Sequence, residues 1–180
     1  MARRNRVVIT GIGIVAPNGI GLSEFWSSLL AGRSGIGPIT LFDATGFRSR
    51  IAGEVKNFDP HQFIESQWKP KRMARHTQLA YVAAMMALRD AGLDPDNLDL
   101  PSPTPVVIGV STSAIDVIES VYQALNNNGP NRAPVTSSAA SIPQAAANTI
   151  ADRIGVSARA ATVSSAWIGP FESNDGPAVS

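Results

Sequence analysis

Apolar runs of strand length alternate with helical patterns along most of this chain, and this order constrains the fold more than any other feature. The strand-like runs lie at residues 6–15, 106–110 and 160–165, with a possible further strand at 51–55. Helical patterns separate them, and residues 33–72 are irregular. The first run has few polar interruptions, which is typical of a strand buried on both faces of a sheet. The order predicts an α/β fold, with a mostly parallel sheet covered by helices.

The first helical pattern begins near Ser23, a residue suited to an N-cap, and ends at Gly32. We expect its apolar side chains to be buried, and these are Phe25, Trp26, Leu29 and Leu30. Two further helices are expected, over residues 113–125 and over residues 141–154.

The strongest helical pattern covers residues 74–91. Apolar side chains recur there at i, i+3, i+4 and i+7, and Gly92 supplies the C-terminal stop. Ser141 and Gln144 have the spacing of a capping box, so we expect them to open the helix that closes at Gly155.

Composition excludes several classes of protein. A chain of 180 residues with a net charge of +1 fits one domain and gives no field that would favour nucleic acid. It contains no cysteine, which excludes disulfides, thiolate metal sites and a cysteine nucleophile. The two histidines, His61 and His76, lack metal-ligand spacing, and we interpret both as ordinary surface or interfacial residues. No apolar run approaches the ~20 residues that span a bilayer, so we expect a soluble cytoplasmic protein.

Gly11, Gly13 and Ala16 fit the G-x-G-x-x-A spacing of a dinucleotide-binding turn. That turn needs a helix to begin at the glycines, whereas Pro17 to Gly19 interrupt the chain here. The spacing therefore favours a strand exit that needs glycine for reasons of backbone geometry.

Several phrases of the sequence, in order, resemble the β-ketoacyl-acyl-carrier-protein synthases of the thiolase-like superfamily. They are VVITGIGIVAP at 7–17, FWSSLLAGRSGI at 25–36, ITLFD at 39–43, AGEVKNFDP at 52–60, RM at 72–73, ALRDAGL at 87–93 and TVSSA at 162–166. The resemblance covers residues 6–166. It implies the N-terminal half of a thiolase-like layered fold, ending at the nucleophile.

In the family the last phrase leads into a cysteine at a helix N-terminus, where the helix dipole favours the thiolate. Such enzymes extend a carrier-bound acyl chain by decarboxylative Claisen condensation, with two histidines from the second half and no cofactor. Here Trp167 occupies the nucleophile position, and an indole cannot accept an acyl group. The resemblance therefore implies acyl carrier protein as partner and a homodimer for the intact enzyme, but an inactive chain.

Residues 167–180 follow neither the family nor any helical or strand period. We expect residues 1–166 to form an incomplete ketosynthase N-terminal domain, and residues 167–180 to be a disordered or frameshifted tail. Three origins remain open: a frameshifted or mis-spliced gene end, a truncated fragment, and a non-catalytic subunit. Such a subunit would dock acyl carrier protein or pair with a full synthase.

The resemblance also implies two binding sites. Lys69, Lys71 and Arg72 match the place where these enzymes meet their acidic carrier protein, although a solvated charged loop is the simpler reading. Thr112 matches a position that lines the acyl pocket, where the family often has a glycine-rich strand end. Alternatively, Ser111 and Ser113 there are helix caps.

Overall fold

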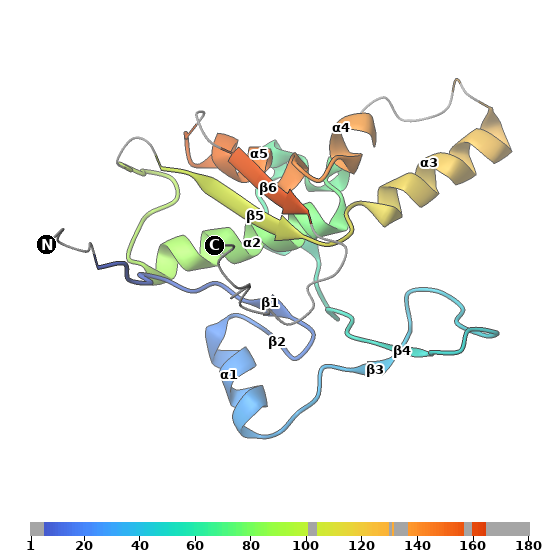
Figure 1. The fold of residues 1–180 in the computed structure, drawn as a ribbon, viewed down its shortest axis with the longest axis horizontal. Helices are drawn as coiled ribbons and strands as arrows, with labels where there is room; N and C mark the ends of the chain where they lie inside the picture. The colour runs from blue at the N-terminus through green and yellow to red at the C-terminus, as the bar shows by residue number, and fades with distance from the viewer. Residues whose placement is uncertain (1–5, 101–103, 130, 132–136, 157–159, 165–180) are drawn as a thin grey trace, which may run out of the picture.

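A computed structural model describes residues 6–100, 104–129, 131, 137–156 and 160–164 (Figure 1). Two strands, β5 (Val106–Val110) and β6 (Ala160–Ser164), lie side by side and in parallel, with Val110 opposite Ser164. Helix α5 (Ala145–Arg153) packs on both strands and on the long helix α2 (Arg75–Asp90). These four elements form the body of the molecule.

The core lies where α2 meets α5 and β5. The buried side chains of α2 are Thr77, Tyr81, Val82 and Met85. Ala147, Ile150 and Ala151 of α5 pack against the same cluster. The predicted helix at residues 74–91 is thus confirmed, and Gly92 follows it with a φ of 75° that suits glycine.

The predicted parallel sheet is confirmed only in part. β5 and β6 are parallel, and the bounds predicted for β5 are those observed. The other two sheets among the described residues are short antiparallel pairs. One joins β1 (Val15–Ala16) to β2 (Gly19–Ile20), and the other joins β3 (Gly37–Pro38) to β4 (Ile51–Ala52).

The predicted first strand is wrong for residues 6–14, which belong to none of these sheets. The segment runs instead along α2, where the backbone N–H of Ile12 donates to the Asp90 carboxylate at 2.9 Å. A Cβ at Gly13 would lie 1.8 Å from the carbonyl oxygen of Ala83, and one at Gly11 would lie 2.2 Å from that of Ala87. The two glycines therefore allow the segment to approach the helix backbone, which explains their spacing without a nucleotide.

Helix α1 (Leu22–Leu30) begins one residue before the predicted cap Ser23. Its N-cap is Gly21, and no side chain caps it. The expected burial is also wrong: Trp26, Leu29 and Leu30 are exposed, and only Phe25 is half-buried. The helix packs mainly against β2, and most of its apolar face has no covering element among the described residues.

Helix α3 (Ile115–Asn128) extends beyond its predicted end, and the short helix α4 (Ser137–Ser141) precedes α5. The predicted capping box is wrong, because the Ser141 hydroxyl donates to the carbonyl of Ser138. The side-chain amide of Gln144 donates instead to the carbonyl of Ala160, at 2.7 Å, and so ties α5 to β6. Among the described residues, no helix is both long and apolar enough to cross a membrane.

Candidate functional site

The three basic residues predicted to bind a carrier protein lie on one exposed turn. Lys69 separates two 3₁₀ turns, η2 (Ser66–Trp68) and η3 (Pro70–Arg72). Its φ of 51° is in the left-handed region. Lys69, Lys71 and Arg72 are all exposed. We call residues 69–72 the basic turn.

The basic turn is anchored to α2 from its C-terminal side. Pro70 is the buried residue of the turn, and the side-chain amide of Gln78 donates to the carbonyl of Pro70 at 3.0 Å. The same amide lies 3.4 Å from the carbonyl of Met73. The turn therefore presents its charges from a fixed backbone.

A polar cluster, here called the Arg153 cluster, lies on the N-terminal side of the basic turn, and Tyr81 and the Arg153 side chain are its buried members. The Tyr81 hydroxyl donates to Glu65 Oε2 at 3.0 Å and accepts from Arg153 Nε at 3.1 Å. Arg153 also donates to the carbonyl of Pro95 and to Asp96 Oδ1, each at 2.5 Å. Burial, reinforced by the hydrogen bond to Glu65, raises the pKa of Tyr81 to about 12, so its hydroxyl keeps its proton at neutral pH.

An apolar groove of about 320 Å³ begins at Arg72. It runs between the start of α2, at Met73 and Thr77, and the α4–α5 segment, where Ile142 and Ala145 contribute. The basic turn thus adjoins an apolar surface.

The carboxyl ends of β5 and β6 meet at one edge of the sheet. Thr112 follows β5 there and is exposed. The cap of the next helix is Ala114, with no side-chain hydrogen bond, so the alternative prediction of a serine cap is wrong. The backbone N–H of Arg75 donates to Asp116 at 2.9 Å, which joins the start of α2 to the start of α3. This bond brings the basic turn to the same end of the molecule as Thr112.

Trp167 and the tail at residues 167–180 lie outside the described residues. The two histidines are separate. His61 is exposed, and its backbone N–H donates to the Asp59 carboxylate at 3.0 Å. Burial lowers the pKa of half-buried His76 despite the opposing charge of Asp116. Within the described part of the chain, no histidines or carboxylates group as metal ligands would.

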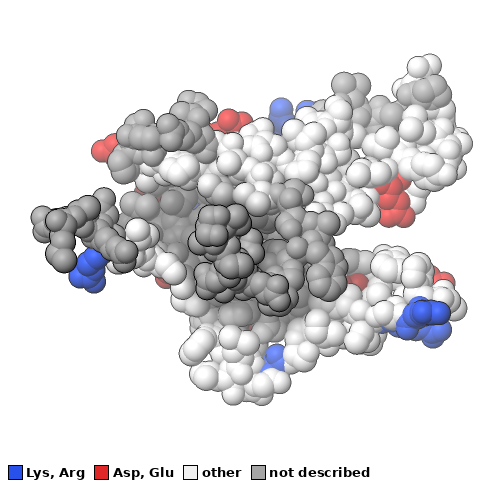
Figure 2. Space-filling model, viewed as in Figure 1, with Lys and Arg blue, Asp and Glu red and all other residues white. Residues whose placement is uncertain are grey.

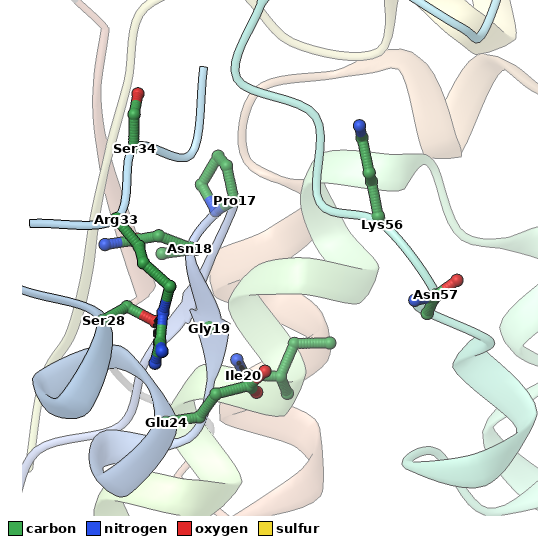
Figure 3. A pocket seen from close by; sticks show the side chains of 11 residues that line it. Pro17, Asn18, Gly19, Ile20, Glu24, Ser28, Arg33, Ser34, Lys56 and Asn57 are labelled. Carbon is green, nitrogen blue, oxygen red and sulfur yellow. Dashed lines mark hydrogen bonds between the residues drawn. The ribbon is translucent and has the colours of Figure 1, made fainter. Parts of the chain in front are cut away.

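A second cavity, of about 360 Å³, lies between the β1–β2 hairpin and the segment at residues 56–57 (Figure 3). Arg33 lies over Ser28 there and bonds its hydroxyl at 3.3 Å, whereas Lys56 points away from Arg33. The two cations do not converge on a common point, so this cavity lacks the geometry of an anion site. Figure 2 likewise shows basic side chains in small separate groups over the face that it displays.

Sequence reasoning missed the Arg153 cluster. Its members come from four segments, and Arg153 reaches Tyr81 across 72 positions of the sequence. The only local signal was an arginine in the last turn of a helical pattern, which is common on exposed surfaces.

Comparison with known proteins gives one consistent family. Residues 4–167 match the model of the beta-ketoacyl synthase N-terminal domain. The tetracenomycin polyketide synthase ketoacyl synthase alpha subunit of Streptomyces glaucescens is 44% identical over 124 residues, which are 69% of this chain and 29% of that protein. The 3-oxoacyl-acyl-carrier-protein synthase 2 of Synechocystis sp. is 40% identical over 129 residues, 72% of this chain and 30% of that protein.

A solved structure of the ishigamide ketosynthase/chain length factor superposes with a TM-score of 0.74 at 33% identity, over 90% of this chain and 40% of that one. The chain thus spans about 30% of the length of the two curated relatives. Both the ordered sequence phrases and the matching fold agree with the matched domain model. The chain therefore belongs to the beta-ketoacyl synthase family and contains its N-terminal domain.

Proposed function

We propose that this chain carries the carrier-protein docking surface of a β-ketoacyl synthase and does not itself condense acyl groups. The observation that carries the docking proposal is the anchored basic turn, at the same end of the molecule as the carboxyl ends of β5 and β6. An acyl group delivered from a carrier bound there would need to travel only along one end of the domain. The name of the Synechocystis relative includes an acyl carrier protein, which supports a partner of this kind.

The proposed reaction of the whole enzyme is decarboxylative Claisen condensation in fatty-acid or polyketide synthesis, in the cytoplasm and without a cofactor. Thr112 would line the acyl pocket, where its hydroxyl makes the surface more polar than a glycine-rich strand end. The sequence has no cysteine, so this chain cannot form the acyl-cysteine intermediate.

A second candidate is a non-catalytic subunit that pairs with a complete synthase. The exposed side chains of Val107 and Val163, which share one face of the β5–β6 pair, favour it because such a face gains from being covered. The similar ishigamide structure is that of a ketosynthase/chain length factor. An intact family member would use the same face to form a homodimer.

Charge reversal of the basic turn tests the docking proposal. Each exposed ion pair is worth roughly 0–1 kcal/mol, so Lys71→Glu with Arg72→Glu should cost up to about 2 kcal/mol in total, or up to about 30-fold in Kd. The measurement is titration of acyl carrier protein at low ionic strength, repeated at higher salt. The double variant should also flatten the salt dependence, because fewer charges remain to be screened.

Arg48 and Arg50 supply a matched control, since both are exposed and lie on the β3–β4 hairpin, away from the basic turn. Reversal of these two changes the net charge equally and should leave most of the affinity intact. Equal losses in both double variants would mean that only net charge matters, and the basic turn would then be an ordinary solvated face.

A further inference from the structure

The Arg153 cluster contacts η2, the 3₁₀ turn that immediately precedes the basic turn. The proposed condensation gives this cluster no role. We propose that Arg153 is a positioning residue that holds the basic turn in its docking conformation through Tyr81, Glu65 and Trp68. The role in docking rests on the proposed function, whereas the effect on the turn can be measured without any partner.

Arg153 is well placed to fix distant segments against one another. Its side chain is 6% exposed, whereas the Asp96 side chain that it bonds is 72% exposed. One guanidinium group contacts α2 through Tyr81, the loop after α2 through Pro95 and Asp96, and Glu65 at 3.6 Å. Since the guanidinium is planar and rigid, these bonds define a single relative position for the three segments.

The path from the cluster to the basic turn is short. Glu65, bonded by the Tyr81 hydroxyl, is the residue that opens η2. Trp68 closes η2, with its ring centroid 6.4 Å from that of Tyr81 and 5.9 Å from the Arg153 guanidinium carbon. Lys69 follows immediately, in its left-handed conformation. Both ends of η2 are therefore fixed by the cluster.

The two ends of the basic turn are held by different contacts. Gln78 holds the backbone after Lys69, as described above, and the Arg153 cluster holds the backbone before it. A non-glycine residue does not stay in the left-handed region without support from its surroundings. Loss of the upstream support should let Lys69 leave that region, and its ammonium group would then point elsewhere.

The variant Arg153→Lys separates positioning from charge. Lysine retains the positive charge beside Glu65 and Asp96, but it has no planar fork to bond Tyr81, Pro95 and Asp96 together. Tyr81→Phe is a milder second variant, which removes only the hydroxyl between Arg153 and Glu65. Arg89→Lys is the control, since Arg89 is exposed near the end of α2.

Hydrogen exchange measured by mass spectrometry reports on the turn directly. The amides of Lys69, Arg72 and Met73 donate to carbonyls within residues 66–70, so they are protected only while the turn holds its shape. In Arg153→Lys and Tyr81→Phe, exchange of a peptide covering residues 66–73 should quicken by roughly tenfold, while peptides from α2 keep their rates. Arg89→Lys should leave both unchanged.

Binding gives the second readout. Carrier affinity should fall about fivefold to tenfold in Arg153→Lys with the slope of its salt dependence retained, because all three basic side chains remain. Unchanged exchange in residues 66–73 of both variants, with the fold intact, would overturn the positioning role, as would a rise spread evenly over the whole chain. If the unaltered chain does not bind the carrier at all, the docking proposal fails, and the exchange result still decides whether Arg153 positions the turn.

Discussion

Substitution of Gly13 by alanine tests the packing of the N-terminal segment on α2. The new Cβ would lie 1.8 Å from the carbonyl oxygen of Ala83 and 2.6 Å from the backbone nitrogen of Ala87. Both atoms belong to the helix backbone, so neither can swing aside as a flexible side chain would. The segment must therefore lift away from α2 by more than an ångström.

The cost has two parts. Overpacking of a tight contact costs about 1–3 kcal/mol. The same displacement would break the hydrogen bond from Ile12 to Asp90, now 2.9 Å long, for about 1 kcal/mol more. The total of about 2–4 kcal/mol is a large part of the roughly 5–15 kcal/mol that stabilises a typical domain. In a chain of 180 residues it should lower Tm by about 4–16 °C.

Thermal unfolding followed by far-ultraviolet circular dichroism measures this loss. Gly109→Ala is the matched control, because no atom of the described residues lies within 4 Å of a Cβ placed there. It should leave Tm unchanged or raise it slightly, since alanine restricts the unfolded chain. If Gly13→Ala has the same Tm as Gly109→Ala, the close approach of the N-terminal segment to α2 is refuted.

Three further outcomes follow from the sequence and the structure. Hydrogen bonds from Thr40 and Leu41 lower the pKa of buried Glu54, so its contribution to stability is complete above its ordinary value of 4.5 and is lost as the pH falls below it. Urea unfolding of Glu54→Gln should accordingly depend less on pH in the acid range, and an unchanged dependence would contradict this. Intact mass after incubation with acyl and malonyl carrier proteins should show no acyl adduct, and a stable adduct would disprove inactivity. Sedimentation velocity should show self-association that rises with concentration and weakens in Val163→Lys, whereas a monomer at all concentrations would argue that the exposed β5–β6 face needs no cover.

The sequence predicted elements whose evidence is local. The apolar period of α2 and the β-branched run of β5 can each be read within one short window, and both are confirmed. Residues 6–14 have the same strand-like composition, yet they form no strand here, because a strand also needs a partner that composition does not reveal. The apolar face of α1 was predicted on equally local evidence, and Trp26, Leu29 and Leu30 on that face are exposed, with no element of the described residues covering them.

The candidate site shows the same difference between local and long-range evidence. The exposure of Lys69, Lys71 and Arg72 agrees with a surface role, while their binding of a carrier remains a prediction, as does the pocket role of Thr112. The contacts that hold the basic turn join Arg153 to residues far away in the sequence, and no spacing rule connects them. Ordered phrases of the sequence carry the resemblance to a family, whereas the supporting contacts depend on the three-dimensional fold.

The parallel pairing of β5 with β6 has a consequence for synthesis of the chain on the ribosome. About 50 residues separate the end of β5 from the start of β6, and at about 5–20 residues per second their translation takes roughly 3–10 s. Throughout that interval β5 has left the synthesis site without its partner, which is long compared with the microseconds in which a helix such as α3 forms. The helices between β5 and β6 can therefore form before the two strands pair. During that time β5 is unpaired and accessible to a chaperone.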